Sequence, residues 1–127
     1  MTSHVVTFTA PHTAELLAQE VGSPGPGQLL CRTTVSLLSA GTELLCYRGE
    51  WDADSLWARP QPYPMCPGYC NVGRVVEVGE GVTGFSVGDR VYNVASHRSY
   101  ALLPADDPRL VKLPEYISDE EAAWAWL

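Results

Sequence analysis

The chain has 127 residues, the size of one ordinary domain, and carries 15 acidic against 8 basic residues for a formal net charge of -7. A partner bound through phosphates requires a clustered basic face, so this charge argues against nucleic acid and an anionic membrane. No apolar run approaches the length that spans a bilayer, and the N-terminus lacks the pattern of a secretion signal. We therefore expect a cytoplasmic protein whose four cysteines stay reduced.

The first third of the chain predicts strands joined by turns. Residues 5–9 are strand formers, whereas residues 14–21 fit either a short helix or a strand, and intrinsic propensity favours the helix. The run SPGPG at 23–27 predicts a tight turn, because its prolines fix φ and its glycines adopt conformations that other residues resist. Residues 28–37 then alternate as a strand does.

The middle of the chain combines a short helix with a long loop. Residues 43–48 are expected to be helical, and residues 50–65 are rich in aromatic residues and proline without any regular period. Such a pattern is typical of a long loop, and long loops often carry function.

The last part of the chain predicts a mainly β domain with mostly antiparallel, barrel-like pairing. A capping box between Ser118 and Glu121 predicts a helix start near the end of the chain. The expected strands cover 71–78, 90–94, 99–103 and 110–113, with turns at 79–81 and 86–88.

The most specific pattern is GYCNVGRVVEVGEGV at 68–82, closed by VGDRV at 87–91. Its glycine offsets resemble the substrate-domain signature of the medium-chain dehydrogenase/reductase superfamily, and the runs PGPG at 24–27 and AGTE at 40–43 extend the resemblance over nearly the whole chain. The resemblance implies one GroES-like substrate-binding domain over 1–127, a partly open antiparallel β-barrel with a few short helices. It makes residues 14–21 a strand and residues 115–127 the start of a connector towards a Rossmann domain that this chain lacks.

Two positions that carry zinc ligands in zinc-dependent members of that superfamily are changed here. Tyr69 stands where the signature has histidine, and Ala40 stands where the first cysteine ligand would be. A catalytic zinc needs about three protein ligands, and the four-cysteine run of the structural zinc is also missing. The resemblance therefore implies no metal. A site made of Cys46, Cys66, Cys70 and His97 is the alternative, but cysteine is commonly a small buried hydrophobe.

Three residues are candidates for catalytic or cofactor contacts. Thr42 matches a hydroxyl that relays a proton between substrate and cofactor ribose, and Gly41 with Thr42 would touch the cofactor. The alternative for Thr42 is that it only caps the following helix. The Tyr69 phenol can hydrogen-bond or protonate a carbonyl oxygen, or its ring can fill the volume left by the metal.

Five residues are candidates for substrate contact. Tyr47 precedes an Arg-Gly pair as in zinc-independent quinone reductases, so it would border the cleft. Trp51 and Trp57, in the long loop, can line a hydrophobic pocket or cover the barrel. Cys70 and His97 complete the set, although a lone histidine in a loop is usually exposed and inert.

The resemblance implies hydride transfer between NAD or NADP and an alcohol, ketone or enone, most like the branch that includes bacteriochlorophyllide hydroxyethyl dehydrogenases. The chain has no GxGxxG run, so a Rossmann domain, in cis or on a separate chain, would hold most of the cofactor. We expect the isolated chain to be inactive and the full-length protein to form a homodimer. Two tryptophans near Leu127 favour an excised domain. The alternatives are a free-standing binding or assembly module and one half of a split oxidoreductase.

Overall fold

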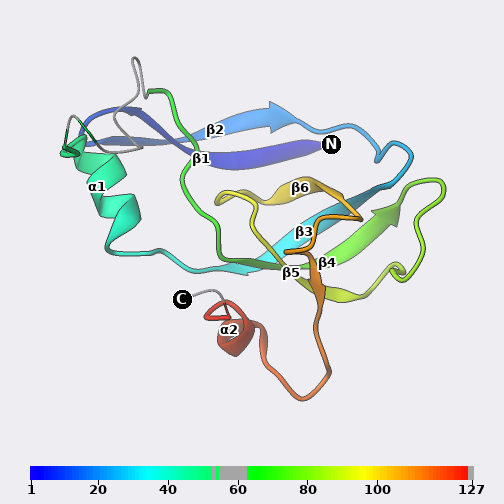
Figure 1. The fold of residues 1–127 in the computed structure, drawn as a ribbon. Helices are drawn as coiled ribbons and strands as arrows, with labels where there is room; N and C mark the ends of the chain where they lie inside the picture. Colours follow the sequence, from blue (N-terminus) through cyan, green and yellow to red (C-terminus); the bar gives the residue numbers. More distant parts are fainter. Residues whose placement is uncertain (53, 55–62, 126–127) are drawn as a thin grey trace.

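The computed structural model describes residues 1–52, 54 and 63–125, and it consists mainly of antiparallel strands (Figure 1). A two-stranded sheet holds β1 (Thr2–Ala10) and β2 (Thr13–Glu20). A five-stranded sheet in the order β6-β3-β4-β5-β7 holds β3 (Gln28–Ser36), β4 (Asn71–Val78), β5 (Arg90–Asn93), β6 (Tyr100–Pro104) and β7 (Val111–Lys112). The two short helices are α1 (Thr42–Arg48) and α2 (Asp119–Ala122). This arrangement confirms the predicted mainly β fold with few short helices.

The strand β2 corrects the helix that propensity alone favours at 14–21. It pairs with β1 along its whole length, from Thr2 opposite Glu20 to Ala10 opposite Thr13. Every residue of β2 is exposed, so a helix at this position would bury no apolar face. The backbone hydrogen bonds to β1 therefore stabilise the strand. The resemblance was therefore the better guide than propensity.

The strand β1 also joins the two sheets. The Val6 amide donates to the His97 carbonyl at 2.9 Å, and the Ser99 amide donates to the His4 carbonyl at 2.9 Å. Further along, Phe8 forms an isolated bridge with Met65. The segment before β6 is thus held against β1, and His97 lies at this junction.

Both faces of the five-stranded sheet are covered. Val91 and Tyr92 are neighbours in β5, so they point to opposite faces. Val91 packs with Leu29 and Val75, while Tyr92 packs with Val72 and with two alanines of the α2 segment, Ala122 and Ala123. In Figure 1 α2 lies beneath the sheet, on the side away from β1 and β2.

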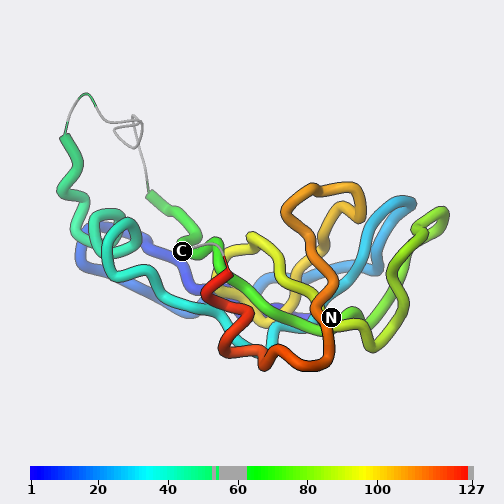
Figure 2. Tube along the Cα trace, turned by 60° about the horizontal axis from the view of Figure 1, so that its bottom comes forward, coloured from blue at the N-terminus to red at the C-terminus, as the bar shows by residue number. Residues whose placement is uncertain are grey.

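The turns at 22–27 and 79–84 lie side by side at the end of the molecule opposite α1 (Figure 2). The Gly27 amide donates to the Glu80 carbonyl at 2.9 Å. A Cβ at Gly79 would lie 2.0 Å from the Gly25 carbonyl oxygen, which no side chain tolerates. This close approach is the physical reason for one of the glycines in the signature.

The C-terminal segment is fixed to the sheet through Asp119. Its carboxylate accepts from Thr34 of β3 at 2.6 Å and from Arg90 of β5 at 2.6 to 2.7 Å. Arg90 also donates to the carbonyls of Ile117 and Pro114. The predicted capping box is confirmed, since Ser118 and Glu121 exchange two hydrogen bonds. We call Thr34, Arg90 and Asp119 the connector clamp.

None of the described helices has the length and hydropathy needed to cross a membrane. All four cysteines are free.

Candidate functional site

Three of the candidate residues, Gly41, Thr42 and Tyr47, belong to the helix α1 or to its N-cap. The N-cap is Gly41, and Gly49 ends the helix in a left-handed conformation, with the Gly49 amide donating to the Leu45 carbonyl at 2.9 Å. Thr42 is the first helical residue, and the N-cap position before it has no side-chain hydrogen bond. The reading of Thr42 as the helix cap is therefore wrong, because Gly41 takes that place and leaves the hydroxyl outside the cap.

A buried chain of polar side chains connects α1 to the rest of the domain. His97 Nε2 lies 3.1 Å from both carboxylate oxygens of Glu43, and His97 Nδ1 lies 2.9 Å from Ser36 Oγ. Glu43 is 5% exposed and His97 is 6% exposed. An ionised carboxylate can only accept, so Nε2 donates to Glu43. The Ser39 amide adds one more donor to the carboxylate, at 3.2 Å. We call Glu43, His97 and Ser36 the polar triad.

The surroundings of His97 differ from those expected of a lone loop histidine. Its amide donates to the Pro67 carbonyl at 2.9 Å, and its own carbonyl accepts from Val6. Gly68 lies against it with φ at +107°, where a Cβ would be 2.6 Å from the His97 amide nitrogen. His97 is thus a fixed, buried residue, and the expectation of an exposed histidine is wrong because β1 and the 67–68 turn enclose it.

A mostly apolar cavity of about 240 Å³ opens between α1 and β1. Residues from β1, from the 38–40 turn and from α1 line it: Phe8, Leu38, Ser39, Ala40, Glu43, Leu44 and Tyr47. The Glu43 side chain that lines it turns its carboxylate to His97. The polar triad therefore lies directly behind one wall of the cavity.

Tyr47 lines this cavity. Its hydroxyl donates to the His12 carbonyl at 2.7 Å, and its ring packs edge-on against Phe8 with centroids 5.4 Å apart. Trp51 stacks on Tyr63 at 6.1 Å, beyond the end of α1. Trp57 lies outside the described residues.

Tyr69 and Cys70 lie apart from the cavity. Cys70 is 1% exposed and packs with Val72 and Tyr92, and Tyr69 packs against the same cluster. Burial raises the pKa of the Cys70 thiol, with Glu43 adding to the rise and a Tyr92 hydrogen bond opposing it. Burial raises the pKa of Cys31 to about 12. Both thiols are therefore poor nucleophiles at neutral pH.

The donors in the described part of the chain do not suit a catalytic zinc. No group of three or more histidine, cysteine, aspartate or glutamate side chains comes together there. Ala40 offers no donor at the matched cysteine position, and His97, which contacts α1, already pairs with Glu43.

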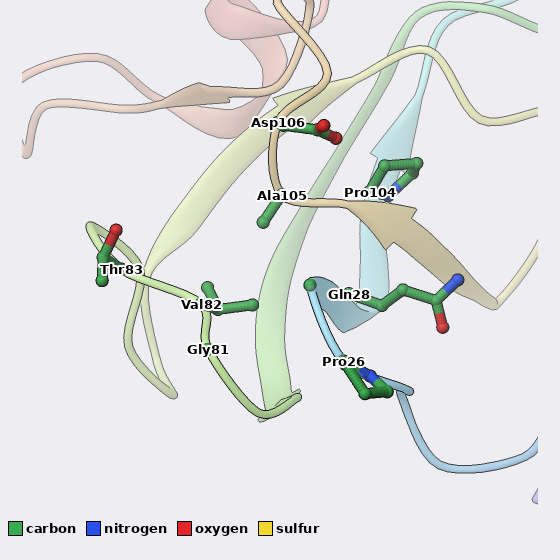
Figure 3. Close-up of a pocket in the computed structure, with 9 residues that line it drawn as sticks. Pro26, Gln28, Gly81, Val82, Thr83, Pro104, Ala105 and Asp106 are labelled. Atoms are coloured by element: carbon green, nitrogen blue, oxygen red, sulfur yellow. The ribbon is translucent and has the colours of Figure 1, made fainter.

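A larger cavity, of about 420 Å³, lies at the opposite end of the five-stranded sheet (Figure 3). Val82 and Ala105 face its interior, whereas the Gln28 side chain points away and accepts from the Gly25 amide at 3.0 Å. None of the candidate residues lines it. The cavity at α1 is therefore the better candidate site.

Sequence reasoning missed two members of the polar triad, Glu43 and Ser36. Glu43 belongs to the quoted AGTE run, but an acidic residue in the first turn of a helix is explained by the helix dipole alone. Its partner His97 stands 54 positions later. The one signal in the sequence was that an acidic residue at the start of a helix and a single central histidine are both present and can pair.

Comparison with known proteins identifies the family. A family model described as alcohol dehydrogenase GroES-like domain matches residues 25–115. The chain is 36% identical over 95 residues to 2-desacetyl-2-hydroxyethyl bacteriochlorophyllide A dehydrogenase of Cereibacter sphaeroides, covering 72% of this chain and 27% of that protein. It is 42% identical over 86 residues to L-threonine 3-dehydrogenase of Pyrococcus abyssi, covering 66% of this chain and 22% of that protein.

The solved structure of a putative NADPH:quinone reductase from Bacillus thuringiensis superposes with a TM-score of 0.81 at 22% identity, covering 100% of this chain and 38% of that one. At that identity it supports the fold alone. The chain belongs to the alcohol dehydrogenase GroES-like domain family, which confirms the resemblance drawn from the glycine signature. It spans about a quarter of the length of the two relatives.

Proposed function

We propose that the chain is the substrate-binding part of an NAD- or NADP-dependent oxidoreductase that acts on an alcohol, a ketone or an enone. The observation that carries this proposal is the cavity between α1 and β1, because Tyr47 lines it and so does Ala40, which directly precedes Gly41 and Thr42 in the chain. Two relatives that are dehydrogenases by name support the reaction class. A cytoplasmic location and a homodimer of the full-length protein are predictions from the sequence and its resemblance.

The nicotinamide cofactor would be held mainly by a Rossmann domain, in cis or on a separate chain. Gly41 suits a contact with it, because Gly41 is exposed and nothing lies within 4 Å of a Cβ built there. Thr42 follows and is half-buried. When bound, the cofactor supplies or accepts the hydride. Thr42 would hold the substrate oxygen and pass on its proton, and the apolar walls of the cavity would exclude water.

We further propose that this chemistry proceeds without zinc. Ala40 and Tyr69 replace two matched ligands, and the contact between Glu43 and His97 leaves neither group free to bind a metal. Polarisation of a carbonyl would then depend on hydrogen-bond donors such as Thr42.

The experiment that tests the proposed function is the intact mass of the natural gene product, followed by titration with NADH and NADPH. We expect a product that continues past Leu127 into a Rossmann domain, or one that works with a separate dinucleotide-binding chain, and that binds one of the two cofactors. A product of 127 residues that binds neither cofactor, alone or with the protein encoded beside it, would overturn the proposal and leave a binding module.

Two substitutions in the active product separate the roles of Thr42 and Tyr69. We expect Thr42→Ala to lower kcat about 100-fold, the loss typical of a proton-transferring group, while Thr42→Ser keeps most of the rate. Tyr69→Phe should change kcat far less, because Tyr69 packs against the Tyr92 cluster. Steady-state kinetics would refute these roles if Thr42→Ala kept the wild-type kcat, or if Tyr69→Phe lost as much as Thr42→Ala does.

A further inference from the structure

We propose that the cavity between α1 and β1 binds the uncharged, apolar part of the substrate, a group about as large as an aromatic ring or a short branched alkyl chain. This inference rests on the proposed function and narrows it. It places the substrate among hydrophobic alcohols, ketones or enones, and it excludes zwitterionic amino acids and polyols.

The lining of the cavity favours carbon over polar atoms. Phe8, Leu38, Ala40 and Leu44 present hydrocarbon only. The Tyr47 hydroxyl already donates to the His12 carbonyl. A substrate with several hydroxyls would find the Ser39 side chain as a partner here, and each further buried hydroxyl left unpaired would cost about 1–3 kcal/mol.

The one carboxylate in the lining is already hydrogen-bonded within the polar triad. Both carboxylate oxygens of Glu43 face His97 Nε2 at 3.1 Å, and one of them also accepts from the Ser39 amide. With 5% of its surface exposed, Glu43 has little carboxylate to offer a ligand. The ammonium group of an amino acid would therefore lose its water without gaining an ion pair.

The volume of the cavity sets the size of the group. About 240 Å³ is available, whereas a dry cavity of roughly 150 Å³ suffices for benzene. Cavities that enclose a whole drug-sized ligand are larger, about 300–1,000 Å³. The cavity thus holds one ring or one branched chain, and the reacting carbon would lie outside it, near Thr42.

Direct binding to the 127-residue chain without nicotinamide tests this inference. The probe is benzyl alcohol, followed by the backbone amide signals of Leu38, Glu43 and Tyr47 in nitrogen–proton NMR spectra. We expect saturable shifts with a Kd of about 1 mM, as suits so small a ligand. L-threonine and sorbitol at the same concentrations should leave these signals in place.

A matched pair of variants locates the binding. Ala40→Leu fills the cavity from an exposed lining position and should weaken benzyl alcohol at least 10-fold, while Ala14→Leu on the exposed strand β2 should change its Kd by less than about 2-fold. If Ala40→Leu does not fold, Leu44→Gln on α1 is the second variant. We expect it to weaken binding as well.

Three results would overturn the inference: no shifts with benzyl alcohol, equal affinity in the variants that alter the cavity, or shifts of the same amides by L-threonine or sorbitol. Its failure differs from that of the proposed function. If the gene product bound benzyl alcohol but no dinucleotide, the cavity assignment would stand and the proposed oxidoreductase function would fail. If it bound a dinucleotide but no benzyl alcohol, the proposed function would stand and the cavity assignment would fail.

Discussion

Replacing His97 by alanine is expected to destabilise the domain by about 3 kcal/mol, because it removes a hydrogen-bond donor from a buried carboxylate. Glu43 would keep the Ser39 amide as a donor but lose the two contacts at 3.1 Å from the imidazole. Ser36 would lose its partner as well. The measurement is urea unfolding followed by circular dichroism, with the free energy of unfolding compared between wild type and variant.

A control variant and a double variant test whether the loss of stability comes from the contact between His97 and Glu43. His4→Ala removes an exposed histidine from β1 and should change the free energy of unfolding by no more than about 0.5 kcal/mol. The double variant with Glu43→Ala should lose about 1–3 kcal/mol less than the sum of the single losses, because each change removes the same contact. Strict additivity, or a loss below about 1 kcal/mol in His97→Ala, would show that the pair contributes little to stability.

Most strands of this fold could be predicted from the sequence, because the patterns that indicate them are local. Residues 28–37 alternate as strands do and residues 71–78 are rich in β-branched residues, and the structure has β3 at 28–36 and β4 at 71–78. The Ser118 capping box depends on residues three apart, and it is present. For residues 14–21 local propensity predicted a helix, and this was wrong, because pairing with β1 imposes the strand conformation.

The site was less readable because its contacts are not local. Tyr47 could be placed at a cleft through the resemblance, but the partnership of Glu43 with His97 depends on the 67–68 turn and β1 closing around the histidine. The 67–68 turn is possible because Gly68 has a positive φ and no Cβ. A glycine offset alone indicates a turn, and it does not tell which side chain will lie against it.

The second large effect is expected from Arg90→Met, which should lower the free energy of unfolding by about 2 kcal/mol. Arg90 is 16% exposed and Asp119 is 18% exposed, and the pair links β5 to α2. The methionine keeps most of the aliphatic stem but removes the donors to Asp119, Ile117 and Pro114. Amides of residues 114–122 should exchange their hydrogens faster than those of β3 and β4, since the connector clamp supplies the hydrogen bonds from the side chains of the sheet to this segment.

The pH dependence of the same variant identifies Asp119 as the partner. Burial raises the pKa of Asp119, but hydrogen bonds from Thr34 and Arg90 outweigh it and hold that pKa below the ordinary 3.8. A lowered carboxyl pKa contributes stability that is complete above the unfolded value and is lost as the pH falls through the folded one. The gap in stability between wild type and Arg90→Met should therefore narrow as the pH falls from about 6 to about 3.

The pair of Arg109 with Asp107 supplies the matched control, because the Arg109 side chain is 51% exposed. Arg109→Met removes the same charge from a surface pair and should leave the urea midpoint at about pH 6 and the exchange of residues 114–122 unchanged within error. If Arg109→Met and Arg90→Met behaved alike, net charge would explain the result. If Arg90→Met alone loosened residues 114–122, Arg90 would be the residue through which the signature at 87–91 fixes the position of this segment on the five-stranded sheet.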